Sequence, residues 1–266
     1  MYLYLLLFFI LGLICSFFIE LLGYRLPLGD SILRKSYCDK CNHNLSLSEK
    51  IPIISFIIQR GRCKHCHQRI SKLYLIIEIM TGVLFSLTYL SFHNDNLEML
   101  KIVFGLLFIT SLIIIFYSDI KYMIIPDEVL IVFSSIIILL KLFIQFQNEE
   151  IINLMDLGYS ILDIIIDVAV VYLIMFAIKK IGDFVFKKES LGKGDLKMMA
   201  YIAIVMDFKL CIVIIFLASF IALPFAIISN LRKDKPMLPF GPCLAIATII
   251  LFLLQVDFNS LLELIH

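Results

Sequence analysis

The sequence predicts an all-α polytopic membrane protein with about eight transmembrane helices and a cytosolic four-cysteine zinc-binding loop. Three observations support this prediction. Of the 266 residues, 61% are hydrophobic, whereas a soluble globular domain is roughly 45–50% apolar. The apolar residues are gathered into runs about as long as a bilayer-spanning helix. Four of the seven cysteines lie in one polar stretch, as two Cys-x2-Cys pairs.

The apolar runs divide the chain into three parts. Residues 1–23 are predicted to form the first transmembrane helix. This run is long enough to span and lacks the basic start and the small-residue cleavage site of a signal peptide. Residues 24–73 are polar and basic and are predicted to form the cytosolic loop. Residues 74–266 are predicted to form a transmembrane bundle with further spans at 74–92, 100–118, 127–146, 160–178, 195–207, 210–230 and 240–258.

The distribution of basic residues favours eight spans. If the N-terminus faces outward, four connecting segments are cytosolic, and together they hold 20 of the 23 Lys and Arg residues. These segments are 24–73, 118–126, 179–197 and 231–239. The sixth span, 195–207, is short for a bilayer. If it did not cross, however, Arg232, Lys233 and Lys235 would lie outside, against the positive-inside rule.

The cysteines of the loop are typical of a structural zinc site. They are Cys38, Cys41, Cys63 and Cys66. Each Cys-x2-Cys turn can present two sulfurs to one tetrahedral ion, and a reducing cytosol argues against disulfides. Nearby alternative ligands are His43, His65 and His67. Four thiolates already satisfy zinc and leave no open position for catalysis. A nucleic-acid-binding ribbon is disfavoured because both ends of the loop are held at the membrane.

Ionisable residues inside membrane spans are costly and are functional candidates. The acidic candidates are Glu20, Glu78, Asp119, Asp127, Asp163, Asp167 and Asp195. Asp119 ends the third predicted span and Asp195 opens the sixth, so the predicted topology places both near the cytosolic face. Asp163 and Asp167 lie one helical turn apart, nearer the outer end of the fifth span. We interpret them as polar contacts between helices.

Two carboxyl groups at one membrane face can hydrolyse a peptide bond. One, ionised, takes a proton from water, while the other, protonated, donates to the scissile carbonyl. Like charges this close share a proton, and a low dielectric strengthens their coupling. Gly192 and Gly194 precede Asp195 and allow a close backbone approach, which an extended substrate requires. The sequence therefore predicts an aspartic endopeptidase with Asp119 and Asp195 as its catalytic pair.

The motifs around these residues resemble those of the type IV prepilin peptidases, also called prepilin leader peptidase/N-methyltransferases, over nearly the whole chain. Besides the two cysteine pairs, the matching segments are Tyr24-Arg25-Leu26-Pro27, Ile51-Pro52-Ile53-Ile54-Ser55, Arg60-Gly61-Arg62-Cys63, Asp119 with Ile125-Pro126-Asp127, Leu191-Gly192-Lys193-Gly194-Asp195-Leu196-Lys197, and Pro239-Phe240-Gly241-Pro242. The resemblance also groups the chain with the Gly-x-Gly-Asp intramembrane aspartic proteases.

The resemblance implies a bacterial inner-membrane enzyme whose active site faces the cytosol. Such an enzyme cleaves the N-terminal leader of prepilins or pseudopilins after a glycine. It then methylates the new N-terminal amine with S-adenosylmethionine, a step associated with the zinc loop. Asp119 and Asp195 would be catalytic. Residues expected to support the substrate or the active site are Gly192, Gly194, Lys197, Pro239, Phe240, Gly241 and Pro242. Residues expected to border the cofactor are Glu20, Arg25 and Glu78.

Other classes of function stay open at this point. A transporter or channel with a zinc-stapled loop would use Asp163 and Asp167 as a relay, although no broken-helix pair or inverted repeat supports it. An adaptor would only scaffold pilus or secretion machinery, and a peptidase without methylation is a further alternative. The expected partners are pilin-like substrates and membrane lipid but not nucleic acid. The oligomeric state is not predicted.

Overall fold

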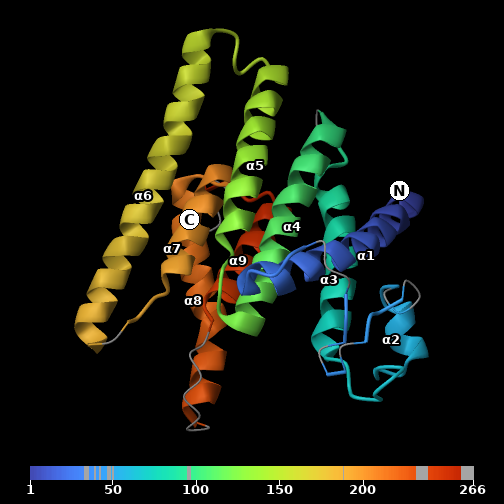
Figure 1. The fold of residues 1–266 in the computed structure, drawn as a ribbon. Helices are drawn as coiled ribbons and strands as arrows, with labels where there is room; N and C mark the ends of the chain where they lie inside the picture. The colour runs from blue at the N-terminus through green and yellow to red at the C-terminus, as the bar shows by residue number, and fades with distance from the viewer. Residues whose placement is uncertain are drawn as a thin grey trace. The chain divides into compact units, whose positions relative to one another are not determined.

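The computed structural model describes residues 1–32, 36–38, 40–41, 43–46, 49, 51–94, 97–187, 189–231 and 239–258. The chain divides into two compact units, Met1–Leu90 and Ser91–His266. All regular elements in the described ranges are helices (Figure 1), and the β pairing found there is limited to two isolated bridges. The prediction of an all-α fold is therefore confirmed.

The first unit is built on two long helices that pack closely. Its elements are α1 (Tyr2–Arg25), the short η1 (Leu26–Leu28), α2 (Ile54–Ile58) and most of α3 (Lys72–Phe92). A Cβ on Gly12 of α1 would lie 2.7 Å from the Cα of Gly82 on α3, so glycine is needed for this approach. Ser86 Oγ donates to the Leu5 carbonyl at 3.0 Å. Small residues at such contacts are typical of helix packing in membranes.

The second unit is a helical bundle centred on α4. Its helices within the described ranges are α4 (Glu98–Tyr122), α5 (Asp127–Gln147), α6 (Leu154–Phe186), α7 (Lys193–Val205), α8 (Phe208–Leu231) and α9 (Gly241–Leu253). Phe108 of α4 is buried against Phe252 of α9, with ring centroids 5.0 Å apart. Ser111 of α4 forms a 2.5 Å hydrogen bond with Tyr201 of α7. The two short helices α7 and α9 are therefore both anchored to α4.

The described part of the chain contains six helices that are long and apolar enough to cross a membrane: α1 with η1, α3, α4, α5, α6 and α8. By contrast, α7 and α9 have 13 residues each. Thirteen residues of helix extend about 20 Å, whereas a hydrocarbon core is about 30 Å thick. The predicted eight spans thus correspond to six full-length helices and two shorter ones. The chain is a multi-pass membrane protein.

The largest difference from the predicted spans concerns α6, which has 33 residues where the span was predicted at 160–178. The charged residues at its two ends lower the hydropathy there, although they continue the helix. At its start, Asp156 accepts the Asn153 N–H at 2.9 Å, which caps the first turn. The connection that holds Arg232, Lys233 and Lys235 lies outside the described residues.

Candidate active site and metal-binding loop

Asp119 lies in the last turn of α4. The helix ends at Tyr122 because Met123 takes a left-handed conformation, with φ 55°, and its N–H donates to the Asp119 carbonyl at 2.9 Å. Asp119 is 6% exposed, and its Oδ2 accepts no hydrogen bond within the part of the chain that the structure describes. A buried carboxylate oxygen without a partner costs free energy, so its position favours a functional role over a structural one.

Asp195 lies in the first turn of α7. Its carboxylate accepts the N–H of Gly192, the residue that caps this helix, at 3.2 Å. Asp195 is 8% exposed, and the positive end of the helix dipole stabilises negative charge at this position. The Asp119 carboxylate acts electrostatically on Asp195. The structure therefore brings the two predicted carboxyl groups close together, although they are 76 positions apart in the sequence.

The start of α9 packs directly against Asp119. A Cβ on Gly241 would lie 2.6 Å from Asp119 Oδ2, closer than real Cβ contacts, so a larger residue here would displace the carboxylate. Ile125, from the connection between α4 and α5, lies between the starts of α7 and α9. Its side chain would be 3.2 Å from a Cβ on Gly194 and 3.5 Å from one on Gly241. Ile125 therefore sets the spacing of the two short helices around the aspartates.

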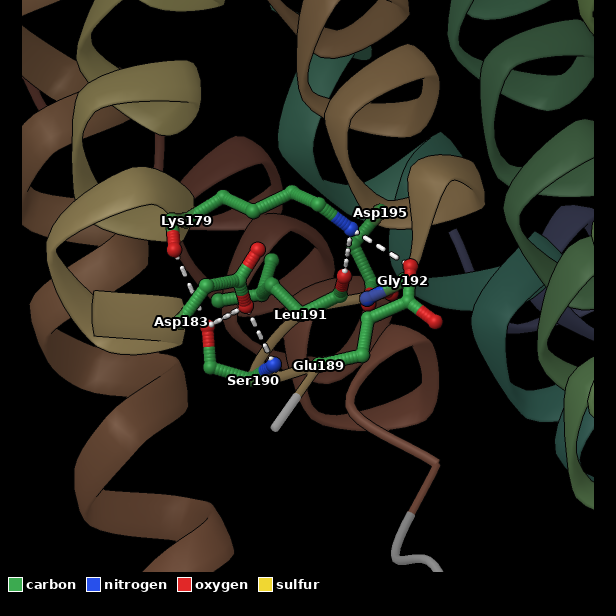
Figure 2. Close-up of polar contacts among 7 residues, drawn as sticks. All are labelled: Lys179, Asp183, Glu189, Ser190, Leu191, Gly192 and Asp195. Atoms are coloured by element: carbon green, nitrogen blue, oxygen red, sulfur yellow. Dashed lines mark hydrogen bonds and ion pairs between the residues drawn. The ribbon is translucent and has the colours of Figure 1, made fainter. Parts of the chain in front are cut away.

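The loop before Asp195 is fastened to the C-terminal end of α6, as Figure 2 shows. Lys179 donates to the Leu191 carbonyl, while the Asp183 carboxylate accepts the N–H and the Oγ of Ser190 at 2.6 and 2.8 Å. Lys179 also acts electrostatically on Asp195. These contacts hold the start of α7 in place, and Lys179, which also forms an ion pair with Glu189 at 2.8 Å, lies near the acidic pair.

The other residues expected near the pair have mainly structural contacts. Lys197 forms an exposed ion pair with Asp127, with Nζ 2.7 Å from both carboxylate oxygens, which joins α7 to the start of α5. Phe240 caps α9 and, like Pro239, is half-buried. Pro242 is buried in the first turn of α9, where a missing N–H loses no helical bond.

The four cysteines converge within the first unit. Their Sγ atoms all lie within 4.8 Å of one another, and the Sγ atoms of Cys38 and Cys66 are 3.9 Å apart. Two thiolates on one tetrahedral zinc ion lie about 3.8 Å apart, so the donors and their spacing fit Zn²⁺. Backbone N–H groups of Cys66 and His65 lower the pKa of the Cys63 thiol to about 7. This favours the thiolate, which is the form that binds metals.

The three residues expected to border a cofactor also lie in the first unit. Arg25 is buried and donates to the two carbonyls of the turn at 31–32, at 3.0 and 2.7 Å. Glu78 accepts the N–H of Ile53 at 2.7 Å and so fixes a residue whose φ is 60°. Glu20 is half-buried on α1. Arg25 and Glu78 thus hold the backbone of the polar loop.

A second group of charged residues lies at the other end of the bundle. The Asp167 carboxylate accepts the Phe208 N–H at 3.4 Å, which links α6 to α8. Lys141 of α5 donates to the Ile204 carbonyl, in the last turn of α7, at 2.7 Å. Asp163 and Asp167 act electrostatically on Lys141. This geometry agrees with the interpretation of Asp167 as a contact between helices, while that of Asp163 stays a prediction.

The sequence analysis gave no role to Ile125 or to Lys179. Ile125 lies within a motif that matches the family. The sequence feature that could have indicated its role is a large apolar side chain in a short connection between two motif segments. Lys179 has no local signal, because its role depends on how the end of α6 meets the loop before α7. Only the fold reveals that contact.

Two family models match this chain. The bacterial peptidase A24 N-terminal domain matches residues 10–92, and the type IV leader peptidase family matches residues 106–227. The second match includes Asp119 and Asp195, and the first includes all four clustered cysteines. No solved structure matches the chain significantly.

Several curated proteins are similar to the chain over most of its length. The prepilin leader peptidase/N-methyltransferase of Bacillus subtilis (strain 168) is 32% identical over 249 residues, which cover 92% of each chain. The protein of the same name from Dichelobacter nodosus is 29% identical over 85% of this chain and 73% of its own. The type 4 prepilin-like proteins leader peptide-processing enzyme of Escherichia coli O78:H11 is 25% identical over 85% of this chain and 78% of its own.

Proposed function

We propose, because the chain belongs to the type IV leader peptidase family, that it cleaves the leader from prepilins or pseudopilins and methylates the new N-terminus. The observation that carries the proposal is the approach of two buried carboxyl groups, Asp119 and Asp195, at the ends of α4 and α7. Relatives named prepilin leader peptidase/N-methyltransferase support both activities.

In the proposed mechanism the two carboxyl groups share one proton. The Gly192 N–H and the start of α7 stabilise negative charge on Asp195, so Asp195 takes a proton from the attacking water. Asp119 carries the shared proton and donates it to the scissile carbonyl oxygen. When the tetrahedral intermediate collapses, Asp119 regains its proton and Asp195 passes the other to the leaving amine. The cycle therefore ends with the pair in its starting state.

We place the enzyme in the bacterial inner membrane with the aspartate pair facing the cytosol. The positive-inside rule supports this orientation, because the connecting segments assigned to the cytosol hold 20 of the 23 Lys and Arg residues. Outward-facing apolar side chains support contact with lipid: Ile131 and Leu139 of α5 are 66% and 69% exposed.

Methylation would take place in the first unit. Glu20, Arg25 and Glu78 fit S-adenosylmethionine by their charges, since two carboxylates suit its sulfonium and ammonium groups and a guanidinium suits its carboxylate. The cofactor would supply an electrophilic methyl group. Zinc held by the four cysteines would fix the polar loop, because such a closed site is structural.

Cleavage of a purified prepilin by the purified protein in detergent tests the peptidase. Asp119→Asn and Asp195→Asn should each lower kcat by roughly 10²–10⁴-fold, the usual contribution of a positioned acid or base, or more. Asp127→Asn is the matched control and should cut, because its carboxylate lies in an exposed ion pair. Normal cleavage by the Asp119 or the Asp195 variant would show that the assignment of the catalytic pair is wrong.

Two further measurements separate the alternatives. Transfer of label from S-adenosylmethionine to the cleaved pilin tests methylation, and loss of transfer in Glu20→Ala, Arg25→Ala and Glu78→Ala tests the border of the site. Asp167→Asn should cut normally; a transporter would depend on this residue more than on Asp119. Binding of a prepilin without cleavage, by a folded protein, would favour an adaptor.

A further inference from the structure

The polar loop carries a second set of metal-ligating side chains, in and near the two cysteine turns at 38–43 and 63–68. This set is His43, Glu49 and His65, and one ligand atom from each lies within 4.8 Å of the other two. The four cysteines complete a tetrahedral site without them. The three side chains therefore need a separate explanation, which does not depend on the proposed peptidase activity.

Glu49 is held with one oxygen free to bind. Its Oε2 accepts the N–H and the Oγ of Ser46 at 2.8 and 2.7 Å, which fixes the carboxylate. Its Oε1 is buried, accepts no hydrogen bond within the described residues, and lies 3.9 Å from His65 Nε2. The Glu49 side chain is only 8% exposed. A buried carboxylate oxygen without a partner is costly, and a distance of 3.9 Å is too long for a hydrogen bond to the imidazole.

The two imidazoles are in direct contact, with ring centroids 3.4 Å apart. If both rings were protonated, their charges would repel each other. As neutral rings, each offers one nitrogen lone pair, and a ligand nitrogen of each ring lies within 4.8 Å of a carboxylate oxygen of Glu49. A single cation would satisfy all three groups.

Comparison of the two cysteine turns shows that their fold does not require the histidines. In the first turn the Cys38 N–H donates to the carbonyl of His43, and in the second the Cys63 N–H donates to that of Gln68, both at 2.9 Å. His43 of the first turn thus occupies the position of Gln68 in the second. In the same alignment of the turns, His65 of the second occupies the position of Lys40 in the first. Gln68 and Lys40 are not imidazoles, yet each turn closes in the same way. Closure of the turns therefore does not explain why positions 43 and 65 hold histidines.

We propose that His43, Glu49 and His65 form a second divalent-metal site that binds Zn²⁺ through three protein ligands and leaves one position open to water. Imidazole and carboxylate ligands bind zinc at about 2.0–2.2 Å, so two of them on one tetrahedral ion lie about 3.4 Å apart. The observed 3.9 Å between Glu49 and His65 needs only a small closure. Nitrogen and oxygen ligands suit a borderline ion, and an open position distinguishes the site from the closed thiolate site.

Titration of the metal-free, reduced full-length protein with Co²⁺ in detergent tests the proposal. The first equivalent should saturate the thiolate-to-cobalt absorption of the four cysteines. A second equivalent should bind without further thiolate absorption. His65→Ala should lose only the second equivalent, whereas His67→Ala, the matched control, should keep both. Binding of a single equivalent by the wild-type protein would overturn the proposal, as would a second equivalent that persists in His65→Ala.

A conservative variant covers the case in which His65→Ala also loses the thiolate absorption and so has lost the cysteine turns. Glu49→Gln keeps the shape of the side chain and should retain the first equivalent. Its affinity for the second should fall by about 10–100-fold, the scale of losing even an outer-shell partner. Unchanged affinity for the second equivalent in Glu49→Gln would equally overturn the assignment.

Discussion

Replacement of Gly241 by alanine should remove most of the cleavage activity while the bundle stays folded. The new Cβ would lie 2.6 Å from Asp119 Oδ2, and ordinary contact begins at 3.4 Å. The carboxylate would therefore have to move by the difference, about 0.8 Å. A misplacement of about 1 Å can cost roughly 10²-fold in rate, so we expect a loss of this order in kcat. The overpacking should cost about 1–3 kcal/mol of stability, which a side-chain rotation of Asp119 can reduce.

Alanine at two other glycines should lower the activity less, according to how closely the new Cβ would contact its neighbours. At Gly194 the new Cβ would meet only the Ile125 side chain, at 3.2 Å, so Gly194→Ala should lose less activity than Gly241→Ala. At Gly158, within α6, a Cβ would meet nothing within 4 Å. Gly158→Ala is thus the control and should cut normally, with a stability gain of up to about 1 kcal/mol from helix propensity.

The assay is the rate of prepilin cleavage in detergent, measured together with thermal unfolding of each variant. The reasoning requires Gly241→Ala to be folded and slow, Gly194→Ala to be intermediate, and Gly158→Ala to be normal. A folded Gly241→Ala that cuts at the wild-type rate would refute the close packing of α9 on the Asp119 carboxylate.

Three further predictions follow from other contacts. Lys141→Met should lower the free energy of unfolding by about 1–3 kcal/mol, because the Ile204 carbonyl loses a charged donor, and Lys141→Arg should recover part of it in the same thermal assay. Lys197→Ala should change stability by less than about 1 kcal/mol, and by less still at high salt, since its pair with Asp127 is exposed and screened; a larger change would mean that the pair contributes more than an exposed ion pair does. The apparent affinity for zinc, measured by competition with a chelator, should weaken as the pH falls below the Cys63 pKa of about 7, because protons then compete for the thiolate; an affinity that does not change as the medium is made more acidic would contradict this.

The long spans and the four-cysteine cluster could be predicted because they depend on local patterns. Runs of apolar residues and the spacing of Cys38, Cys41, Cys63 and Cys66 are readable without a fold. The length of α6 was less accessible, since capping residues and charged turns at helix ends are not hydrophobic. The second ligand set was missed for a different reason. Glu49 stands at no characteristic spacing from His43 or His65, and only the turn around Ser46 brings its carboxylate to them.

The close surroundings of the aspartates were only partly predictable. Topology placed Asp119 and Asp195 at one membrane face, and the glycines before Asp195 suggested close backbone approach. The contact of Gly241 with Asp119 arises between α4 and α9, which are far apart in sequence, so no local pattern encodes it. The same is true of Ile125 between the starts of α7 and α9.

The length of α6 links the aspartate pair to the thickness of the bilayer. Its 33 residues extend about 50 Å, well beyond a hydrocarbon core of about 30 Å, so α6 must tilt or project from the membrane. Because Lys179 and Asp183 fasten the loop before Asp195 to this helix, a change in its tilt carries that loop with it. We therefore expect the loop before Asp195 to shift with lipid chain length, so that the rate of cleavage of one substrate should differ between short-chain and long-chain membranes.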